Sequence, residues 1–360
     1  MGFKSGRKDS SARPVDDGDE LLRQLVSSLE NEAPYVYLEK DNHDQGLAQT
    51  QNGLPPWFDE ERFKRGVETF EKNIFLMFTG KMAGLLTLLA VPTIVKVLVL
   101  TKKSEEPVKA FRRYVDTIRH MLFWYRSSLK DPKSLSHESL AVVRGHHLRG
   151  AAAARRAGLP GISQLDLVLT QFAFCGIAVV RRKLLHLDAS DQDVLDFMHV
   201  WRTLGCLIGI QDRFNICQFD YDISATDGVL EEVCTRWLGP ALLSPPPEFA
   251  QMSHALLEGS WCIMPVLEYS SFLNFTQELI GIPQPQRTEP PNSYSSSLLY
   301  LLHIVPSTMN WPIIGKFIRM YHNANMHFSL YMSTYHPLLA WYSFPRNTTT
   351  QYKILVPNEA

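Results

Sequence analysis

The stretch DFMHVWRTLGCLIGIQDRFN, residues 196–215, places a histidine, a tryptophan and an arginine inside an otherwise apolar helical pattern. Ser190 stands just before this pattern and predicts the N-cap, because a serine hydroxyl accepts a hydrogen bond from the first amides of a helix. At helical spacing His199 and Arg202 share one face, and Trp201 lies on another. The stretch therefore predicts a core helix that carries either a binding site or a buried polar network.

Two glycines interrupt the same pattern. Gly205 and Gly209 each cost roughly 1 kcal/mol of helix propensity relative to alanine. Either the close packing of a neighbouring helix or a flat ligand offsets that cost, and glycine inside a helix usually has a packing reason. We favour close packing for these two residues.

A second helix repeats the pairing of arginine and histidine. In SHESLAVVRGHHLRGAAAARRAGLPG, residues 136–161, Ser136 predicts the N-cap and Arg144 lies three residues before His147. A buried arginine needs an anion, and a neutral imidazole is the form that ligates a metal. A haem would supply both an iron and carboxylates. The alternative is pairing with internal carboxylates, Asp166, Asp196 and Asp212.

A third helix is expected in SQLDLVLTQFAFCGIAVVRRK, residues 163–183, with Ser163 as its N-cap. Its apolar residues surround the helix, so it should lie in the middle of the core. Phe172 and Phe174 belong to it, and with Trp201 they offer flat surfaces for a macrocycle. Because helical period runs through nearly every segment, the fold class predicted is all-α, with one large helical domain.

The chain divides by composition. The predicted segments are a flexible polar extension at 1–54, a helical domain at 55–282, a Pro- and Ser-rich loop at 283–298, C-terminal helices packed on the core at 299–345, and a tail at 346–360. The formal net charge is −1, which argues against nucleic acid as a partner. The five cysteines form no CxxC pair and indicate buried thiols, with neither a zinc site nor a disulfide framework. The composition does not predict the oligomeric state.

A long apolar run raises the question of a membrane. Residues 75–100, FLMFTGKMAGLLTLLAVPTIVKVLVL, approach the length of a bilayer span but contain Pro92 and Lys96. The run predicts either a membrane anchor or a kinked, buried helix pair. No cleaved secretory signal is expected at the N-terminus. We expect a protein that is membrane-associated, for example at the endoplasmic reticulum, or cytoplasmic.

Four segments together resemble a known family. They are KAFRRYVDTIRHMLFWY, VVRGHHLRGA, ISQLDLVLTQFAFCGIAVV and FMHVWRTLGCLIGIQDRFN, and they resemble the catalytic domain of the endoplasmic-reticulum-bound oxygenase (mpaB-like) and rubber oxygenase family, over roughly residues 60–280. The resemblance implies an all-α fold around a b-type haem. It also implies oxidative cleavage of carbon–carbon double bonds in an isoprenoid or lipid-like substrate by molecular oxygen.

The resemblance carries over residue by residue. Arg144 and His147 match the arginine and histidine of the family's Arg-x-x-His helix, and His199, Trp201 and Arg202 match its His-x-Trp-Arg element. The family's haem-ligating histidine follows a threonine, but here the corresponding place holds Phe172. The resemblance therefore leaves His147 and His199 as metal ligands, with weak haem binding or loss of the chemistry as the other outcomes.

A polar group beside the haem would direct the activated oxygen. Arg113, Thr117 and His120 share one helical face at spacings of four and three, and we assign them this catalytic role. The alternative is the polar stripe of an ordinary amphipathic helix.

Two rival functions remain. Asp196 and His199 form one carboxylate–histidine pair of the kind used by non-haem iron oxygenases, but the partner motifs are missing. A non-catalytic helical protein that binds lipid or membranes and keeps the fold is the second rival, favoured by Phe172.

Overall fold

The computed structural model describes residues 17–39 and 53–344, and every regular element within these ranges is helical. The predicted all-α class is confirmed. The helices that form the body are α1 (Asp17–Asn31), α3 (Glu60–Lys72), α4 (Ile74–Leu88), α5 (Pro92–Thr101), α6 (Pro107–Arg126), α7 (Leu135–Arg156), α8 (Gln164–Val180), α9 (Asp191–Ile208) and α10 (Ile223–Val233). Those that follow are α11 (Gly239–Leu243), α12 (Phe249–Ser260), α13 (Tyr269–Ile280), α14 (Ser293–Thr308), α15 (Ile314–Tyr335) and α16 (Leu338–Ser343).

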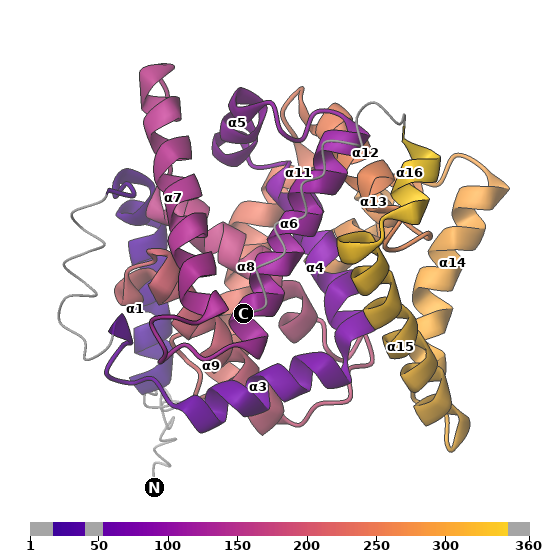
Figure 1. Ribbon diagram of the computed structural model, residues 1–360, viewed down its shortest axis with the longest axis horizontal. Helices are drawn as coiled ribbons and strands as arrows, with labels where there is room; N and C mark the ends of the chain where they lie inside the picture. Colours follow the sequence, from indigo (N-terminus) through magenta and orange to yellow (C-terminus); the bar gives the residue numbers. More distant parts are fainter. Residues whose placement is uncertain (1–16, 40–52, 345–360) are drawn as a thin grey trace, which may run out of the picture.

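Helices α4 and α8 pack on each other in the middle of the molecule (Figure 1). Both are apolar on all sides, as a helix surrounded by protein must be. Gly84 lets the two backbones touch, since a Cβ there would lie 2.2 Å from the carbonyl oxygen of Ala173. The expectation that residues 163–183 form a central core helix is therefore correct.

The apolar run at 75–100 folds as two helices. Fourteen of the fifteen residues of α4 are buried inside the protein. The chain bends by 90° between α4 and α5. Pro92 begins α5 and accounts for the break. Within the described ranges no single helix is long and apolar enough to span a membrane, although the bent pair has sufficient length and composition. Of the two alternatives, the burial of α4 agrees with a kinked, buried helix pair. In α5 only Val95 is buried.

Serine residues cap the N-termini of the three helices that carry the sequence motifs, α7, α8 and α9. Ser163 and Ser190 begin α8 and α9, each in a reciprocal capping box with an aspartate three residues on. The predicted cap Ser136 is wrong, because Ser134 caps α7 and accepts a hydrogen bond from the His137 amide. The hydroxyl of Ser136 instead donates to the Phe123 carbonyl and so ties α7 to the end of α6.

Part of the predicted N-terminal extension is folded. Helix α1 packs against α10, and its Leu25, Val26 and Leu29 are buried. These residues form the apolar stripe of an amphipathic helix, and that stripe stabilises the segment on the body. This differs from the flexible extension predicted over 1–54. Residues 1–16 and 40–52, and the predicted tail at 346–360, lie outside the described residues.

The C-terminal helices begin earlier than the sequence predicts. Asn292 caps α14 by accepting a hydrogen bond from the Ser295 amide, so the predicted loop at 283–298 ends at residue 292. Helices α14, α15 and α16 lie together along one side of the molecule, with α14 against α13 and α15 against α4 (Figure 1).

The cysteines agree with the prediction of buried thiols. All five are free, and only Cys206 is partly exposed. The closest pair is Cys175 and Cys217, whose Sγ atoms are 3.8 Å apart without a bond.

Candidate functional site

His199 is held by protein groups at both ring nitrogens. Its side chain is 1% exposed on α9. Nε2 accepts a hydrogen bond from the Asp59 amide at 3.0 Å, so the ring proton is on Nδ1, which donates to Asp220 at 2.6 Å. No ring nitrogen is left for iron. The predicted role of His199 as a metal ligand is therefore not supported by the structure.

Arg202 is balanced by carboxylates. Its guanidinium donates to Asp212 at 2.8 Å and to Asp220 at 3.2 Å. The guanidinium carbon also lies 4.0 Å from the ring centroid of Trp57, a favourable cation–π geometry. The charge of Arg202 thus needs no haem carboxylate. The internal pairing with Asp212 weighed from the sequence is present.

Asp196 completes this network between α3 and α9. Burial opposes its ionisation, but hydrogen bonds from Arg65 at 2.6 Å and Arg62 at 2.9 Å hold the pKa of Asp196 below its usual value. The carboxylate is thus engaged by arginines and does not form a metal site with His199. Within residues 17–39 and 53–344 no group of three His, Cys, Asp or Glu side chains could hold a metal. The non-haem iron alternative therefore has no support here.

The sequence did not reveal the partners of this network. Arg62 and Arg65 stand on a strongly charged helix, where arginines normally face solvent. Asp220 lies in a turn after α9 and comes next to His199 only through the fold. In the sequence, the only indication of these three partners is that many charged residues stand close to a helix that is otherwise apolar.

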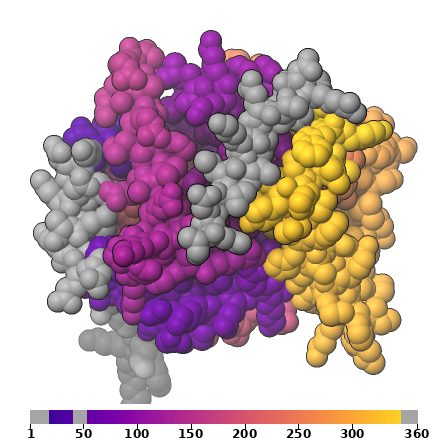
Figure 2. Space-filling model, viewed as in Figure 1, coloured from indigo at the N-terminus to yellow at the C-terminus, as the bar shows by residue number. Residues whose placement is uncertain are grey.

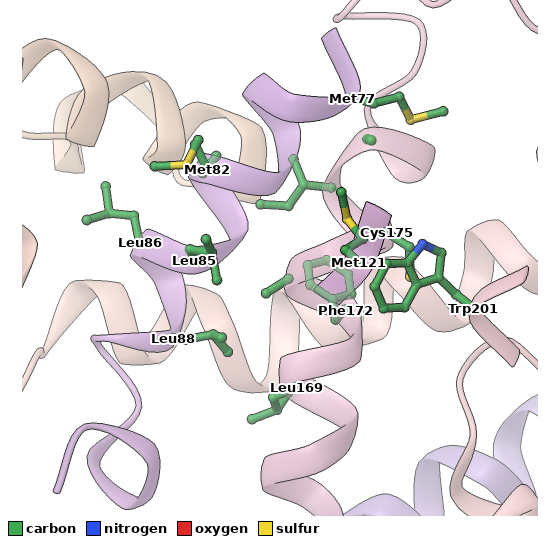
Figure 3. Packing of buried hydrophobic residues seen from close by; sticks show 14 of the residues in the cluster. Met77, Met82, Leu85, Leu86, Leu88, Met121, Leu169, Phe172, Cys175 and Trp201 are labelled. Carbon is green, nitrogen blue, oxygen red and sulfur yellow. The ribbon is translucent and has the colours of Figure 1, made fainter. Parts of the chain in front are cut away.

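Phe172 is part of the apolar core. It is fully buried, and its ring covers Gly176 so closely that a Cβ there would lie 2.3 Å away. Figure 3 shows it among Met121, Cys175 and Trp201. A phenyl ring in this position cannot coordinate iron, so the place of the family's ligand is occupied by packing.

Trp201 packs against aromatic neighbours from two other helices. Its ring centroid is 5.1 Å from that of Phe174 on α8 and 6.5 Å from that of Tyr125 on α6. The edge-to-face contact with Tyr125, at 83°, is a preferred aromatic geometry. The predicted aromatic surface of Trp201, Phe172 and Phe174 does come together, as the wall between α6, α8 and α9.

Gly205 is required by a neighbouring side chain. A Cβ there would lie 2.3 Å from Nε2 of Gln171, which donates to the Trp201 carbonyl at 2.8 Å and to Asn215 at 2.9 Å. Close packing is therefore the correct interpretation. Gly209 is not within the helix: it ends α9 with a φ of 122°, a backbone conformation that suits glycine.

Gly205→Ala should lower the free energy of unfolding by about 1–3 kcal/mol, because the new methyl displaces a buried amide that makes two hydrogen bonds. Gly150→Ala on α7 is the control, since its nearest neighbour is 3.7 Å away and helix propensity favours alanine. Urea unfolding of both variants measures the difference. Equal stability of Gly205→Ala and the wild type would refute the packing argument.

His147 differs from His199 in having an unused nitrogen. Its Nδ1 is buried on α7 and has no hydrogen-bond partner in the described structure. Burial, with smaller contributions from Arg113 and His146, lowers the pKa of His147 to about 4. The imidazole is therefore neutral at pH 7, which is its ligating form.

Arg113 lies near His147, on the facing helix α6. Burial lowers the pKa of its guanidinium, and its one hydrogen bond is a long one of 3.3 Å to the hydroxyl of Thr101. No carboxylate of the described residues forms an ion pair with it. Arg113 is half-buried, and a partly desolvated cation favours an anionic partner. Arg144 of α7 is half-buried on the same helix as His147.

Thr117 and His120 lie on the same helix as Arg113. Thr117 donates its hydroxyl to the Arg113 carbonyl at 2.9 Å, and His120 Nδ1 is 2.7 Å from the hydroxyl of Ser139 on α7. Burial lowers the pKa of His120 to about 4, with further contributions from His146 and Arg119. The contact with α7 means that His120 does not belong to a plain solvent-facing stripe.

The residues between α6 and α7 fit a haem in part. A neutral histidine with an unshared nitrogen suits iron, and a half-buried arginine without an acid suits a propionate. Phe172 and His199 do not fit, for the reasons given above. The groups that remain as candidates for binding a haem are therefore His147 and Arg113.

Comparisons with known proteins agree with this fold. No family model matches the chain, and no curated protein sequence matches it. The fold is similar to that of latex clearing protein. A solved structure described as latex clearing protein in the closed state aligns with 87% of this chain and 89% of its own, with a TM-score of 0.51 and 17% identity. At that identity the likeness concerns the fold alone.

Proposed function

We propose that this chain is an oxygenase that binds a b-type haem through His147 and acts on an isoprenoid or lipid-like substrate with molecular oxygen. The observation that carries the proposal is the buried, unpartnered Nδ1 of a neutral His147. An unsatisfied buried polar atom costs free energy, and an iron atom would use it. The fold shared with latex clearing protein supports the same reading.

The residues around His147 have separate tasks in this proposal. Arg113 binds a haem carboxylate, since its charge has no acid to balance it. When bound, the haem supplies the redox chemistry that activates oxygen for attack on a carbon–carbon double bond.

Two further polar residues of α6, His120 and Thr117, have roles other than binding the macrocycle. His120 is neutral at pH 7 and keeps its Nδ1 against the Ser139 hydroxyl, so its ring orientation is fixed. A neutral imidazole in a fixed orientation can hydrogen-bond a reacting group, but a pKa of about 4 makes it a weak base at pH 7. Thr117 is already committed to the Arg113 carbonyl and serves to position that helix turn.

A second function is favoured by one observation. Phe172 fills the place of the family's ligand with a fully buried ring, and this is the expected state of a chain that kept the fold and lost the haem. In that case the protein is a non-catalytic binder of an apolar ligand.

His147→Ala should abolish the Soret band that the wild type shows after expression with a haem precursor, because alanine cannot coordinate iron. His146→Ala is the matched control, since this neighbouring side chain is exposed. Absorption spectra at equal protein concentration, with circular dichroism to verify folding, give the comparison. If His147→Ala retains the wild-type Soret band, the ligand assignment is wrong.

A further inference from the structure

Large apolar side chains are exposed on the C-terminal helices. Of the twenty-four exposed large hydrophobic residues in the described ranges, sixteen lie between Tyr294 and Tyr342. We call the exposed side of α14, α15 and α16 the aromatic face. Its exposed residues include Ile313, Phe317, Phe328 and Tyr342, at 81%, 63%, 63% and 90%. A soluble surface rarely gathers so many, and such patches mark interaction sites.

The residues of α15 fall on two opposite apolar stripes. Its inner stripe, with Gly315, Met326 and Leu330, is buried. Its outer stripe repeats every three or four residues and is exposed: Ile314, Phe317, Tyr321, Phe328, Tyr331 and Tyr335. A helix that needs only one contact has one apolar stripe. The outer stripe is therefore open to a partner.

The aromatic face carries almost no charge. Residues 290–344 contain no aspartate or glutamate, although the chain has 37 of them. The two cations in this range are Lys316, which is exposed, and Arg319, which is buried and donates to Asn73 at 2.9 Å. Surfaces that meet water normally carry roughly a quarter to a third charged residues. A surface without carboxylates suits an apolar and anionic neighbour.

We propose that the aromatic face of α14–α16 lies on the surface of a lipid bilayer, in the plane of the interface. Tyrosine and tryptophan are the residues that accumulate where hydrocarbon meets headgroups, and Trp311, Tyr321 and Trp341 are exposed there. Lys316 can meet a lipid phosphate. Figure 2 shows α15 and α16 at the molecular surface.

A second copy of the chain fits this face less well. Paired helices usually fix their register with acidic and basic residues beside the apolar seam, and α15 has no acid with which to do so. An apolar cavity of about 220 Å³ also lies between α4, α14 and α15, lined in part by Phe75, Leu301, Val305 and Met326. A cavity of this character next to the face can accept part of an acyl or isoprenoid chain.

The inference is independent of haem, because none of these residues belongs to the α6–α7 site. The test uses the full chain and sedimentation with vesicles of phosphatidylcholine and phosphatidylserine. Phe317→Glu combined with Phe328→Glu should reduce the bound fraction about tenfold or more, since it places two charges in the interface. Tyr221→Glu combined with Leu243→Glu adds the same charge at exposed positions outside the aromatic face and should leave binding unchanged.

Hydrogen exchange of the wild type on the same vesicles tests the face without a substitution. Protection confined to residues 294–342 supports the proposal, whereas protection elsewhere overturns it. Light scattering in the absence of vesicles tests the alternative that a second copy of the chain covers the aromatic face. A dimer that the paired Phe317 and Phe328 substitutions dissociate, together with no vesicle binding by the wild type, assigns the face to a second copy and overturns the proposal.

Discussion

Lys81→Met should raise the free energy of unfolding at pH 7 by several kcal/mol, roughly 3–5, which is the largest gain we expect from any single substitution. Lys81 is 2% exposed in the middle of α4. Its Nζ lies 3.2 Å from the sulfur of Met121 and 4.8 Å from the ring centroid of Phe174. No carboxylate of the described residues pairs with it, and burial lowers its pKa from 10.5 to about 7.

The pH dependence of stability has a definite sign. Between pH 7 and 10.5 the unfolded chain binds a proton at Lys81 that the folded chain has released. The unfolded state is then favoured by proton binding, so stability rises with pH through this window. Below pH 7 both states are protonated, and the penalty from this group is constant. Methionine has a similar shape and no proton to bind, so the variant should lose this slope.

Urea unfolding at several pH values between 6 and 10 measures both effects. Lys96→Met is the control, because Lys96 is exposed on α5 and its removal should change little. A wild type whose stability is constant from pH 7 to 10, or a Lys81→Met variant no more stable than the wild type, would contradict the account of an unpaired buried amine.

His199→Ala should lower the free energy of unfolding by about 2–4 kcal/mol and leave the haem content per chain unchanged. The substitution removes the 2.6 Å hydrogen bond to the buried carboxylate of Asp220, which keeps its contacts with Arg202 at 3.2 Å and Arg62 at 3.3 Å, and it takes away the acceptor of the Asp59 amide. Leaving buried polar groups with unmade hydrogen bonds costs more than the net value of the bonds themselves.

Chemical denaturation and haem quantification on the same sample distinguish structure from ligation. His336→Ala, at an exposed position, should behave as the wild type in both measurements. Loss of the Soret band in a folded His199→Ala protein would show that His199 is needed for haem binding. It would refute the purely structural role proposed for this residue.

The sequence predicted the class of fold and several local features. Helical periodicity and serine caps act over a few residues, so Ser163 and Ser190 are found where the pattern places them. The apolar surround of α8 likewise predicted its central position. Ser136 was misassigned because Ser134 offers the same capping chemistry one half-turn earlier.

The role of the polar residues could not be predicted from helix faces. His199 and Arg202 share a face as expected, but Asp220 and Asp59 reach them only through loops that the chain's periodicity does not describe. The same reasoning treats His147 and His199 as equivalent. The structure separates them, because one has both nitrogens bonded and the other has one buried and free.

The sequence alone also did not predict which apolar helices are buried and which are exposed. Residues 75–100 form the most apolar run in the sequence, yet α4 is buried by α8. The helices of 293–343 are less uniformly apolar, yet their outer side is exposed. Hydrophobicity alone does not say whether protein or another medium covers a helix, since both remove it from water.

The most direct test is the visible absorption spectrum of the purified wild-type chain, expressed with a haem precursor, together with the number of haems per chain. The account predicts a Soret band and a ratio near one, with the iron held by His147. A folded, helical protein with no Soret band under these conditions would contradict it and would assign this chain to the non-catalytic alternative.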